Sequence, residues 1–180
     1  FHRKDGKKII RNRRKNMKIA IKSDVGQRRT LNEDAAGYFL NTQNVPIIVV
    51  CDGIGGHNAG DVASAMALSH LGKRWEEESI TDTEAAYQWL VKNIQAENDR
   101  IFQKANQYRE LDGMGTTLVV AVIIGSELLI ANVGDSRAYL YRNFQIKQLT
   151  EDHTLVQELL KSGEITEEEA KSHPQRNIVT

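Results

Sequence analysis

The sequence predicts an α+β fold with mostly antiparallel sheets, and three observations support this prediction. Segments with strand character come first, two long helical segments follow, and further strand segments come after them, without a strict strand–helix alternation. The later strand segments are separated by short turns, which suits antiparallel pairing. With 40% hydrophobic and 27% charged residues, the 180-residue chain is typical of a soluble globular domain with a sizeable core.

Three strand segments precede the helices. Residues 18–24 alternate apolar and charged side chains, which predicts a half-buried strand, and residues 35–40 predict a second strand. Five of the six residues over 47–52 are apolar and most of these are β-branched, so we expect this strand to be covered on both faces. It ends at Asp52, and a glycine-rich turn over residues 53–56 follows, which allows a ligand to approach the backbone closely.

Two helices are predicted next. Residues 60–75 have helical spacing, with a stripe formed by Val62, Ala65, Leu68, Leu71 and Trp75. Thr81 or Asp82 caps a second helix that runs to about Leu111. Its predicted apolar face, which Asn98 interrupts, consists of Tyr87, Leu90, Ile94, Ile101, Ala105 and Tyr108.

The last third of the chain predicts a meander of strands and two short helices. Residues 116–124 are a continuous run rich in β-branched residues, which predicts another strand covered on both faces. The turn at Gly125-Ser126 leads into the remaining elements. We expect strands over 127–133, 137–142 and 145–149, and exposed helices over 155–161 and 167–172.

The two ends of the chain differ in charge, although the net charge is zero. Residues 1–16 carry eight Lys/Arg and one Asp, a net charge of +7, whereas residues 17–180 carry sixteen Lys/Arg and 23 Asp/Glu, a net charge of −7. Because Met17 opens the first periodic segment, we interpret 1–16 as a tag or other non-native tail and 17–180 as the domain. A basic arm that binds nucleic acid is the other interpretation.

Compartment signals in the sequence are weak. No apolar run approaches the roughly 18 residues that span a membrane, and no apolar segment follows the basic start as in a secretory signal. Cys51 has no second cysteine to pair with, which suits a reducing compartment. We therefore predict a cytoplasmic protein without membrane or nucleic-acid partners.

Acidic residues at strand ends predict a metal site. Glu33 and Asp34 precede a strand, Asp52 ends one, and Asp135 follows another. Clustered carboxylates repel each other by roughly 4 kcal/mol per pair at 4 Å and an effective dielectric of 20, and a divalent cation removes that repulsion. Since the candidate ligands are all oxygen atoms, Mg²⁺ or Mn²⁺ is favoured.

Arginines flank these acids. Arg28 and Arg29 precede the first acidic pair, and a guanidinium group binds phosphate in a bidentate manner, which suggests a phosphorylated substrate. The alternative is that Arg28 and Arg29 are solvated surface residues without a role in binding. Arg137 follows Asp135 and is either part of the site or a structural salt-bridge partner.

Four motifs together resemble a known family. They are Gly26-x-x-Arg29-x-x-Asn32-Glu33-Asp34, Asp52-Gly53-Ile54-Gly55-Gly56, Gly115-Thr116-Thr117 and Asn132-Val133-Gly134-Asp135-Ser136-Arg137. In this order they resemble the metal-dependent protein phosphatase family of the 2C type, in its bacterial form. The resemblance implies an α-β-β-α sandwich of two mostly antiparallel sheets flanked by helices. It also implies hydrolysis of phosphoserine and phosphothreonine in proteins that are substrates of a Ser/Thr kinase.

The resemblance also assigns roles to residues. Asp34 and Asp52 would ligate a centre of two or three Mn²⁺ or Mg²⁺ ions, with the Gly53 carbonyl beside it. Glu33 would act through metal-bound water, and Asp135 would belong to a third metal site. Arg29 would hold the substrate phosphate. The implied reaction is in-line attack on phosphorus by a bridging hydroxide that the metals generate.

This sequence departs from the family pattern in two ways. Many members have His where Ile54 stands here, and the nearest histidine is His57, which is a candidate general acid or a helix-start residue bonded to backbone. The family also has a later Ser-Asp-Gly motif and an Asp-Asn pair that this sequence lacks. We therefore expect a phosphatase domain that is truncated at its C-terminus, with an incomplete metal centre and little or no activity in this chain itself.

Two other functions remain open. The first is a non-catalytic relative of the same fold that acts as a binding or regulatory module, although clustered acids at Asp34 and Asp52 serve no purpose in binding alone. The second is a nucleotide-binding enzyme, suggested by Gly53-x-Gly55. The third position of that fingerprint is Asn58, where Gly or Ala is expected, and the usual downstream acid is missing, so this interpretation is disfavoured.

Overall fold

The computed structural model describes residues 8–11, 17–55, 59–175 and 178–180. The strands are β1 (Lys8–Arg11), β2 (Lys18–Ile21), β3 (Asp34–Leu40), β4 (Pro46–Ile54), β5 (Gly115–Thr116), β6 (Leu118–Ile124), β7 (Glu127–Val133), β8 (Tyr139–Arg142) and β9 (Gln145–Gln148). The helices are α1 (Gly60–Glu77), α2 (Thr83–Gln107), the 3₁₀ turn η1 (Arg109–Leu111), α3 (Leu155–Ser162) and α4 (Glu167–Ser172).

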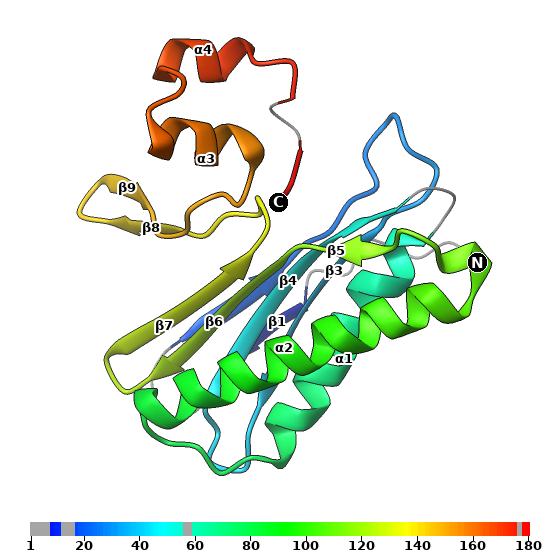
Figure 1. Ribbon diagram of the computed structural model, residues 1–180. Helices are drawn as coiled ribbons and strands as arrows, with labels where there is room; N and C mark the ends of the chain where they lie inside the picture. The colour runs from blue at the N-terminus through cyan, green and yellow to red at the C-terminus, as the bar shows by residue number, and fades with distance from the viewer. Residues whose placement is uncertain (1–7, 12–16, 56–58, 176–177) are drawn as a thin grey trace.

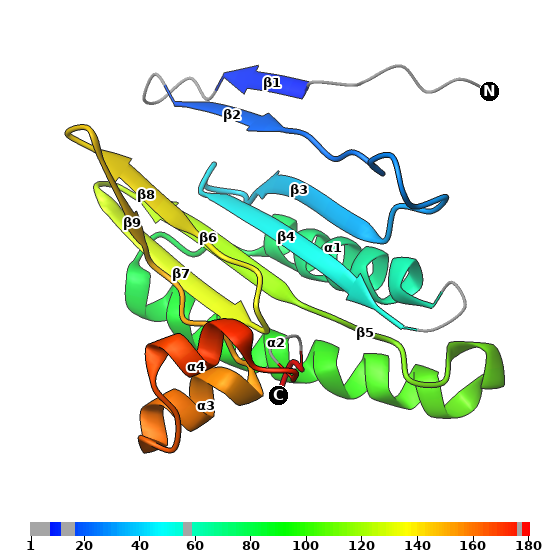
Figure 2. The ribbon, with the colours of Figure 1, turned by 90° about the horizontal axis from the view of Figure 1, so that it is seen from above.

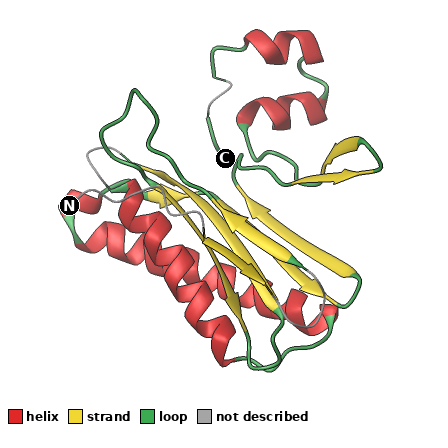
Figure 3. Ribbon diagram, turned by 180° about the vertical axis from the view of Figure 1, so that it is seen from behind, coloured by secondary structure: helices red, strands yellow, loops and turns green. Residues whose placement is uncertain are grey.

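A five-stranded antiparallel sheet forms the body of the molecule. Its order is β3-β4-β6-β7, and β5 extends the β6 side of β4 by pairing with the last residues of β4. Helices α1 and α2 both lie on one face of this sheet, as Figures 1 and 3 show. The other strands form two separate two-stranded sheets, β1–β2 and β8–β9. The predicted α+β class with antiparallel sheets is confirmed, and β1 is an addition, because we expected no strand before residue 18.

The core lies between the sheet and the two helices. Strand β4 contributes Ile47, Val49 and Cys51, which alternate along the strand and are fully buried. Helix α1 places Trp75 against Trp89 of α2, with ring centroids 4.9 Å apart and an angle of 73° between the ring planes. Edge-to-face pairs of this kind add to the stabilisation from burial. The remaining buried members of this core are Ala67, Leu71, Ala86, Leu90, Leu118, Val120 and Val122.

The opposite face of the sheet is apolar but incompletely covered. The prediction that β4 is buried on both faces is wrong, because Val50 and Ile54 are each 43% exposed. Apolar runs do not reveal which face has a covering layer, and here the helices cover only one (Figure 2). The prediction of burial on both faces agrees better with β6, where the consecutive residues Leu118, Val119 and Val120 are all buried.

The helices begin where the sequence predicts, but the buried face of α2 differs. Helix α2 begins after Asp82, whose carboxylate accepts a hydrogen bond from the Ala85 amide at 2.8 Å. It ends at Gln107, short of the predicted Leu111. Tyr87 and Tyr108, predicted on the buried face, are exposed. Leu90 and Ala105 are buried as predicted, and Ile94 and Ile101 pack against the core. The other buried residues of α2 are Ala86, Trp89, Asn93 and Glu97.

A buried asparagine ties the β3–β4 turn to the end of α1. The Asn41 side-chain oxygen accepts hydrogen bonds from the Gln43 and Val45 amides, and its nitrogen donates to the Ile80 carbonyl at 2.7 Å. The Trp75 indole nitrogen donates to the Val45 carbonyl at 2.9 Å. Because these polar groups are all satisfied, they can be buried without penalty. The turn, the helix end and the tryptophan therefore form one connected unit.

The last part of the chain lies at the β7 end of the sheet. The β8–β9 hairpin and helices α3 and α4 follow β7, as Figure 1 shows. Helix α4 has a complete capping box, in which Thr166 and Glu169 satisfy each other's backbone amides. Among the helices in the described ranges, none has the length and apolar character needed to cross a membrane.

Candidate metal centre

The first two acids of the predicted site lie side by side. Asp34 is the first residue of β3, and the antiparallel register places it directly opposite Asp52 on β4. Residues opposite each other in a ladder have Cβ atoms about 4.5–5.5 Å apart and point to the same face. This position is the end of the sheet where β4 runs into the glycine turn. The ladder therefore brings together two acids that are separated by a whole hairpin in the sequence.

The backbone of β4 is held firmly at this point. The Asp52 amide donates to Thr117 Oγ1 at 3.0 Å, and the Asp52 carbonyl accepts from the Thr117 amide at 2.9 Å. The Gly53 amide donates to the Glu33 carbonyl at 3.1 Å. A Cβ atom at Gly53 would lie only 2.1 Å from the Gly60 carbonyl oxygen, so glycine is required for α1 to begin this close to the strand.

Electrostatics at Asp52 favour a bound cation. Partial burial raises the pKa of Asp52, and the neighbouring carboxylates Asp34 and Asp135 raise it further, while Arg29 acts in the opposite direction. A raised carboxylate pKa means that the ionised form is destabilised in the folded chain. A hard divalent cation offsets both the burial and the repulsion, and carboxylate oxygens are its preferred ligands. The donor set therefore fits Mg²⁺ or Mn²⁺.

Glu33 and Arg29 lie beside this pair. Arg29 Nη1 lies 3.4 Å from Glu33 Oε2, and the Arg29 side chain is 68% exposed, so this ion pair is weak. The other carboxylate oxygen of Glu33 packs against the start of α1, 2.8 Å from where a Cβ of Gly60 would be. The Glu33 carbonyl accepts from the Ser64 hydroxyl at 2.6 Å. Glu33 thus supports the site through its backbone as well as through its carboxylate.

Asp135 lies in the loop after β7. Gly134 precedes it with φ of +91°, a conformation that favours glycine. Arg137 binds Asp152 through both its Nε and Nη2 atoms. Of the two roles left open for Arg137, the geometry therefore supports the structural salt bridge. That ion pair ties the loop after β7 to the segment that follows β9.

The predicted ligands do not all converge. Within the ranges 17–55, 59–175 and 178–180, no group of three or more Asp, Glu, His or Cys side chains is arranged to hold a metal ion. The structure brings Asp34 and Asp52 together and places Asp135 within electrostatic range of Asp52. His57 lies outside the described residues. The role of each predicted ligand therefore stays a prediction.

Three hydroxyl residues at the site, Thr116, Thr117 and Ser136, have no role in the sequence-based prediction. Thr117 Oγ1 and Ser136 Oγ are 2.6 Å apart and join the β4–β5 region to the Asp135 loop. Thr116 Oγ1 lies within hydrogen-bond distance of two carbonyl oxygens, that of Asp52 at 3.1 Å and that of Thr117 at 2.9 Å. Both threonines belong to the Gly115-Thr116-Thr117 motif, which was the only signal of their importance in the sequence.

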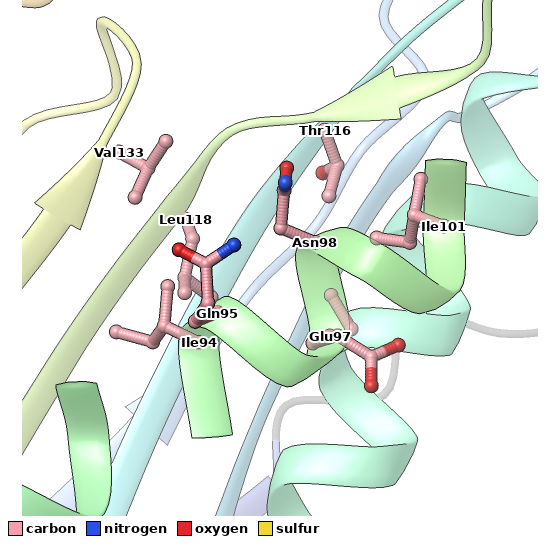
Figure 4. Close-up of a pocket in the computed structure, with 9 residues that line it drawn as sticks. Ile94, Gln95, Glu97, Asn98, Ile101, Thr116, Leu118 and Val133 are labelled. Atoms are coloured by element: carbon pink, nitrogen blue, oxygen red, sulfur yellow. The ribbon is translucent and has the colours of Figure 1, made fainter. Parts of the chain in front are cut away.

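A cavity lies on the helix side of the sheet behind these residues. It has a volume of about 230 Å³ and is bounded by α2, β6 and the end of β7. Figure 4 shows Asn98 of α2 and Thr116 of β5 among the residues that line it. This position explains why Asn98 interrupts the apolar face of α2, since its side chain lies at an open cavity instead of against the sheet. The other residues that line it are Ala67, Ile94, Gln95, Glu97, Ile101, Leu118 and Val133.

Comparison with known proteins agrees with the geometry. The model of the protein phosphatase 2C family matches residues 11–159. Serine/threonine phosphatase stp of Listeria welshimeri is 49% identical over 164 residues, which cover 91% of this chain and 65% of that protein. Protein phosphatase PhpP of Streptococcus pneumoniae is 43% identical, with 91% and 66% covered. The chain thus spans about two thirds of the length of these curated relatives, 65% in the first case.

Solved structures have the same fold. The serine/threonine phosphatase Stp1 of Staphylococcus aureus superposes with a TM-score of 0.82 at 47% identity, covering 87% of this chain and 62% of that one. The catalytic domain of PstP, solved in complex with two manganese ions, gives a TM-score of 0.68 at 36% identity, covering 83% and 61%. The extent of the family match, together with these identities, leads to one conclusion. This chain belongs to the protein phosphatase 2C family.

Proposed function

We propose that the protein is a metal-dependent phosphatase that hydrolyses phosphoserine and phosphothreonine in other proteins. The observation that carries this proposal is the cross-strand pair of Asp34 and Asp52 in a chain of the protein phosphatase 2C family. Two carboxylates held together at the end of a sheet repel each other and so lower stability, whereas a bound cation offsets this repulsion. The names of the relatives, which are serine/threonine phosphatases, support the reaction class.

Asp34 and Asp52 would hold the cations, with Glu33, the Gly53 carbonyl and Asp135 at the margins of the centre. Two or three Mn²⁺ or Mg²⁺ ions are proposed, in keeping with the two manganese ions in the PstP structure. Such ions, when bound, supply a water of lowered pKa and neutralise charge on the phosphoryl group. The protein's contribution is to fix two carboxylates on adjacent strands so that they cannot relax apart. His57 as general acid stays a prediction.

Arg29 is proposed to bind the substrate phosphate. Its side chain is exposed, and its contact with Glu33 is long at 3.4 Å, so the guanidinium group is available to an incoming anion. Removing it should leave the metal ligands in place. In the intact protein, Arg29→Ala should therefore raise KM much more than it lowers kcat.

The proposed substrates are phosphoproteins, among them a Ser/Thr kinase and the proteins that it phosphorylates, and the proposed compartment of this protein is the cytoplasm. The geometry of the site favours a phosphate ester on an accessible segment, because Asp34 and Asp52 are both exposed at the end of the sheet.

The test is phosphate release from a phosphothreonine peptide, measured with Mn²⁺, with Mg²⁺ and after treatment with EDTA. We expect turnover only with added metal, and none in Asp52→Asn. Arg29→Ala at saturating peptide is the matched control, because it should retain metal-dependent turnover. Turnover that survives thorough EDTA treatment, or an Asp52→Asn protein that retains full activity, would rule the proposal out.

A non-catalytic binding module is the second candidate, and one observation favours it. No three acidic or histidine side chains of the described part of the chain converge on a metal site. In such a module, phosphopeptide would bind without hydrolysis and without metal. Peptide binding by fluorescence polarisation in EDTA, together with no phosphate release in Mn²⁺, would identify it.

A further inference from the structure

A buried threonine links the two sides of the candidate metal centre. Thr117 is 2% exposed and lies between β5 and β6. Its Oγ1 atom accepts the hydrogen bond of the Asp52 amide at 3.0 Å. The same Oγ1 lies 2.6 Å from Ser136 Oγ, and Ser136 directly follows Asp135. One hydroxyl group therefore touches the backbone of one candidate ligand and the neighbour of another.

The packing around this contact is tight on the loop side. Gly134 has φ of +91°, and a Cβ atom there would lie 2.8 Å from Thr117 Cγ2. The loop can approach the threonine this closely only because residue 134 is glycine. On the other side, the Gly134 carbonyl accepts the His153 amide at 3.0 Å. The loop that carries Asp135 therefore packs closely against Thr117, and the His153 hydrogen bond holds it in this position.

The three candidate ligands differ in how their positions are fixed. Asp34 and Asp52 are held relative to each other by the β3–β4 ladder. Asp135 stands in a loop beyond the end of β7, so no ladder fixes its distance from Asp52. Carboxylates that repel each other move apart unless their backbones are held. The Thr117–Ser136 contact is a direct side-chain link between the Asp52 backbone and the Asp135 loop.

We propose that Thr117 and Ser136 are positioning residues that fix Asp135 relative to Asp52. This inference rests on the proposed function, because it takes both acids as metal ligands. The two hydroxyls act through hydrogen bonds, without touching substrate or metal. Partners behind metal ligands commonly change metal affinity by about 10–100-fold when they are removed. Thr117 holds the Asp52 backbone through its hydrogen bond, and Ser136 connects Thr117 to the loop that carries Asp135.

A purely structural role makes a different prediction. A buried threonine that only satisfies a backbone amide should affect stability when it is replaced, with no specific effect on the far side of the contact. The chain offers a matched control for that case. Thr150 is also buried, at 8% exposure, and its Oγ1 accepts the Ala138 amide at 3.1 Å, but none of its hydrogen bonds involves Asp52.

The test uses the 180-residue chain and the variants Thr117→Val, Thr117→Ser, Ser136→Ala and Thr150→Val. The first readout is hydrogen exchange of the Asp52 amide in metal-free protein, followed by NMR. Thr117→Val removes the acceptor and should speed exchange by about tenfold, and Thr117→Ser should restore it. Ser136→Ala should speed hydrogen exchange of the Asp52 amide by about threefold, although Ser136 does not touch Asp52. Thr150→Val should leave it unchanged.

The second readout is the affinity for Mn²⁺ alone, measured by calorimetry. Thr117→Val and Ser136→Ala should each weaken binding by about tenfold, the double variant should be little worse than either, and Thr150→Val should bind normally. Exchange of the Asp52 amide that is unchanged in Ser136→Ala, with Mn²⁺ bound normally, would overturn the positioning role and leave the proposed function intact. Coupled exchange in a wild-type chain that binds Mn²⁺ only weakly would support the positioning link, because we expect an incomplete metal centre in this chain.

Discussion

Replacing Asp52 by Asn should stabilise the metal-free chain, although it removes a proposed ligand. Asn is close to the protonated form of Asp in shape but carries no charge. In the folded chain, burial and the carboxylates of Asp34 and Asp135 raise the pKa of Asp52 above 3.8. The folded state therefore binds this proton more tightly than the unfolded state does. The resulting stability is present below pH 3.8 and is lost as the pH rises through the folded-state pKa.

The size of the effect follows from the ladder geometry. Opposite residues have Cβ atoms about 5 Å apart, and two unit charges at that distance repel by about 0.8 kcal/mol in water and about 3 kcal/mol at an effective dielectric of 20. Because Asp52 is exposed, solvent screening puts the value near the lower limit, at about 1 kcal/mol. For a chain of this length, 1 kcal/mol corresponds to a shift in melting temperature of about 2–4 °C.

The assay is thermal unfolding of both proteins in EDTA at low ionic strength. At pH 7 we expect Asp52→Asn to melt about 2–4 °C above the wild type, and at pH 3 we expect no difference. Salt should reduce the gain. Added Mn²⁺ should raise the melting temperature of the wild type only, since ligand binding stabilises the folded state. Asp99→Asn on the exposed face of α2 is the control; a variant at Asp52 that melts below the wild type at pH 7 would show that the acids do not repel.

Three further predictions concern the rest of the chain. Gly72→Ala should destabilise by about 1–3 kcal/mol in urea titrations, because a Cβ there would lie 2.2 Å from Phe39 Cζ, whereas Gly115→Ala enters open space and should cost less. Burial raises the pKa of the Cys51 thiol to about 12, so a disulfide reagent at pH 8 should modify it only after unfolding, and rapid reaction of the native chain would contradict its burial. Deleting residues 1–16 removes β1, which pairs with β2 alone, so activity of the intact protein should stay within a few-fold; a large fall in activity or melting temperature would show a structural role.

The sequence predicted the elements whose signals are local. Helix α1 begins at Gly60 as predicted, and β7 spans Glu127–Val133 as predicted, because a turn residue and a periodic run define each boundary. The Asp82 cap needs only a carboxylate within three residues of the helix start. The prediction that Asp34 and Asp52 share one site depended on the family motifs, because neither strand sequence alone indicates which strands pair.

Features that depend on packing between distant segments were missed. The contact of Thr117 with Ser136 joins residues that only the sheet topology brings together. On α2, the large apolar surface of Tyr87 suggested burial, but the sheet sets the rotation of the helix and selects Trp89 instead. Glu97 is 3% exposed because His70 and Arg100 bind its two oxygens, a network that a periodicity argument treats as a solvated face.

The unit organised around Asn41 has a consequence for the order of folding. Strands β3 and β4 and helix α1 are consecutive in the chain, and the hydrogen bonds of Asn41 with Gln43 and Val45 close the short β3–β4 turn. Its bond to the Ile80 carbonyl joins this turn to the end of α1. Short loops cost little entropy to close, and local contacts form fast. Asp34 and Asp52 belong to this early unit, whereas Asp135 arrives only after β6 and β7 have added to the sheet. We expect the repulsion between the first two acids to be present in the transition state, so that Asp52→Asn speeds refolding, while Ser136→Ala mainly speeds unfolding.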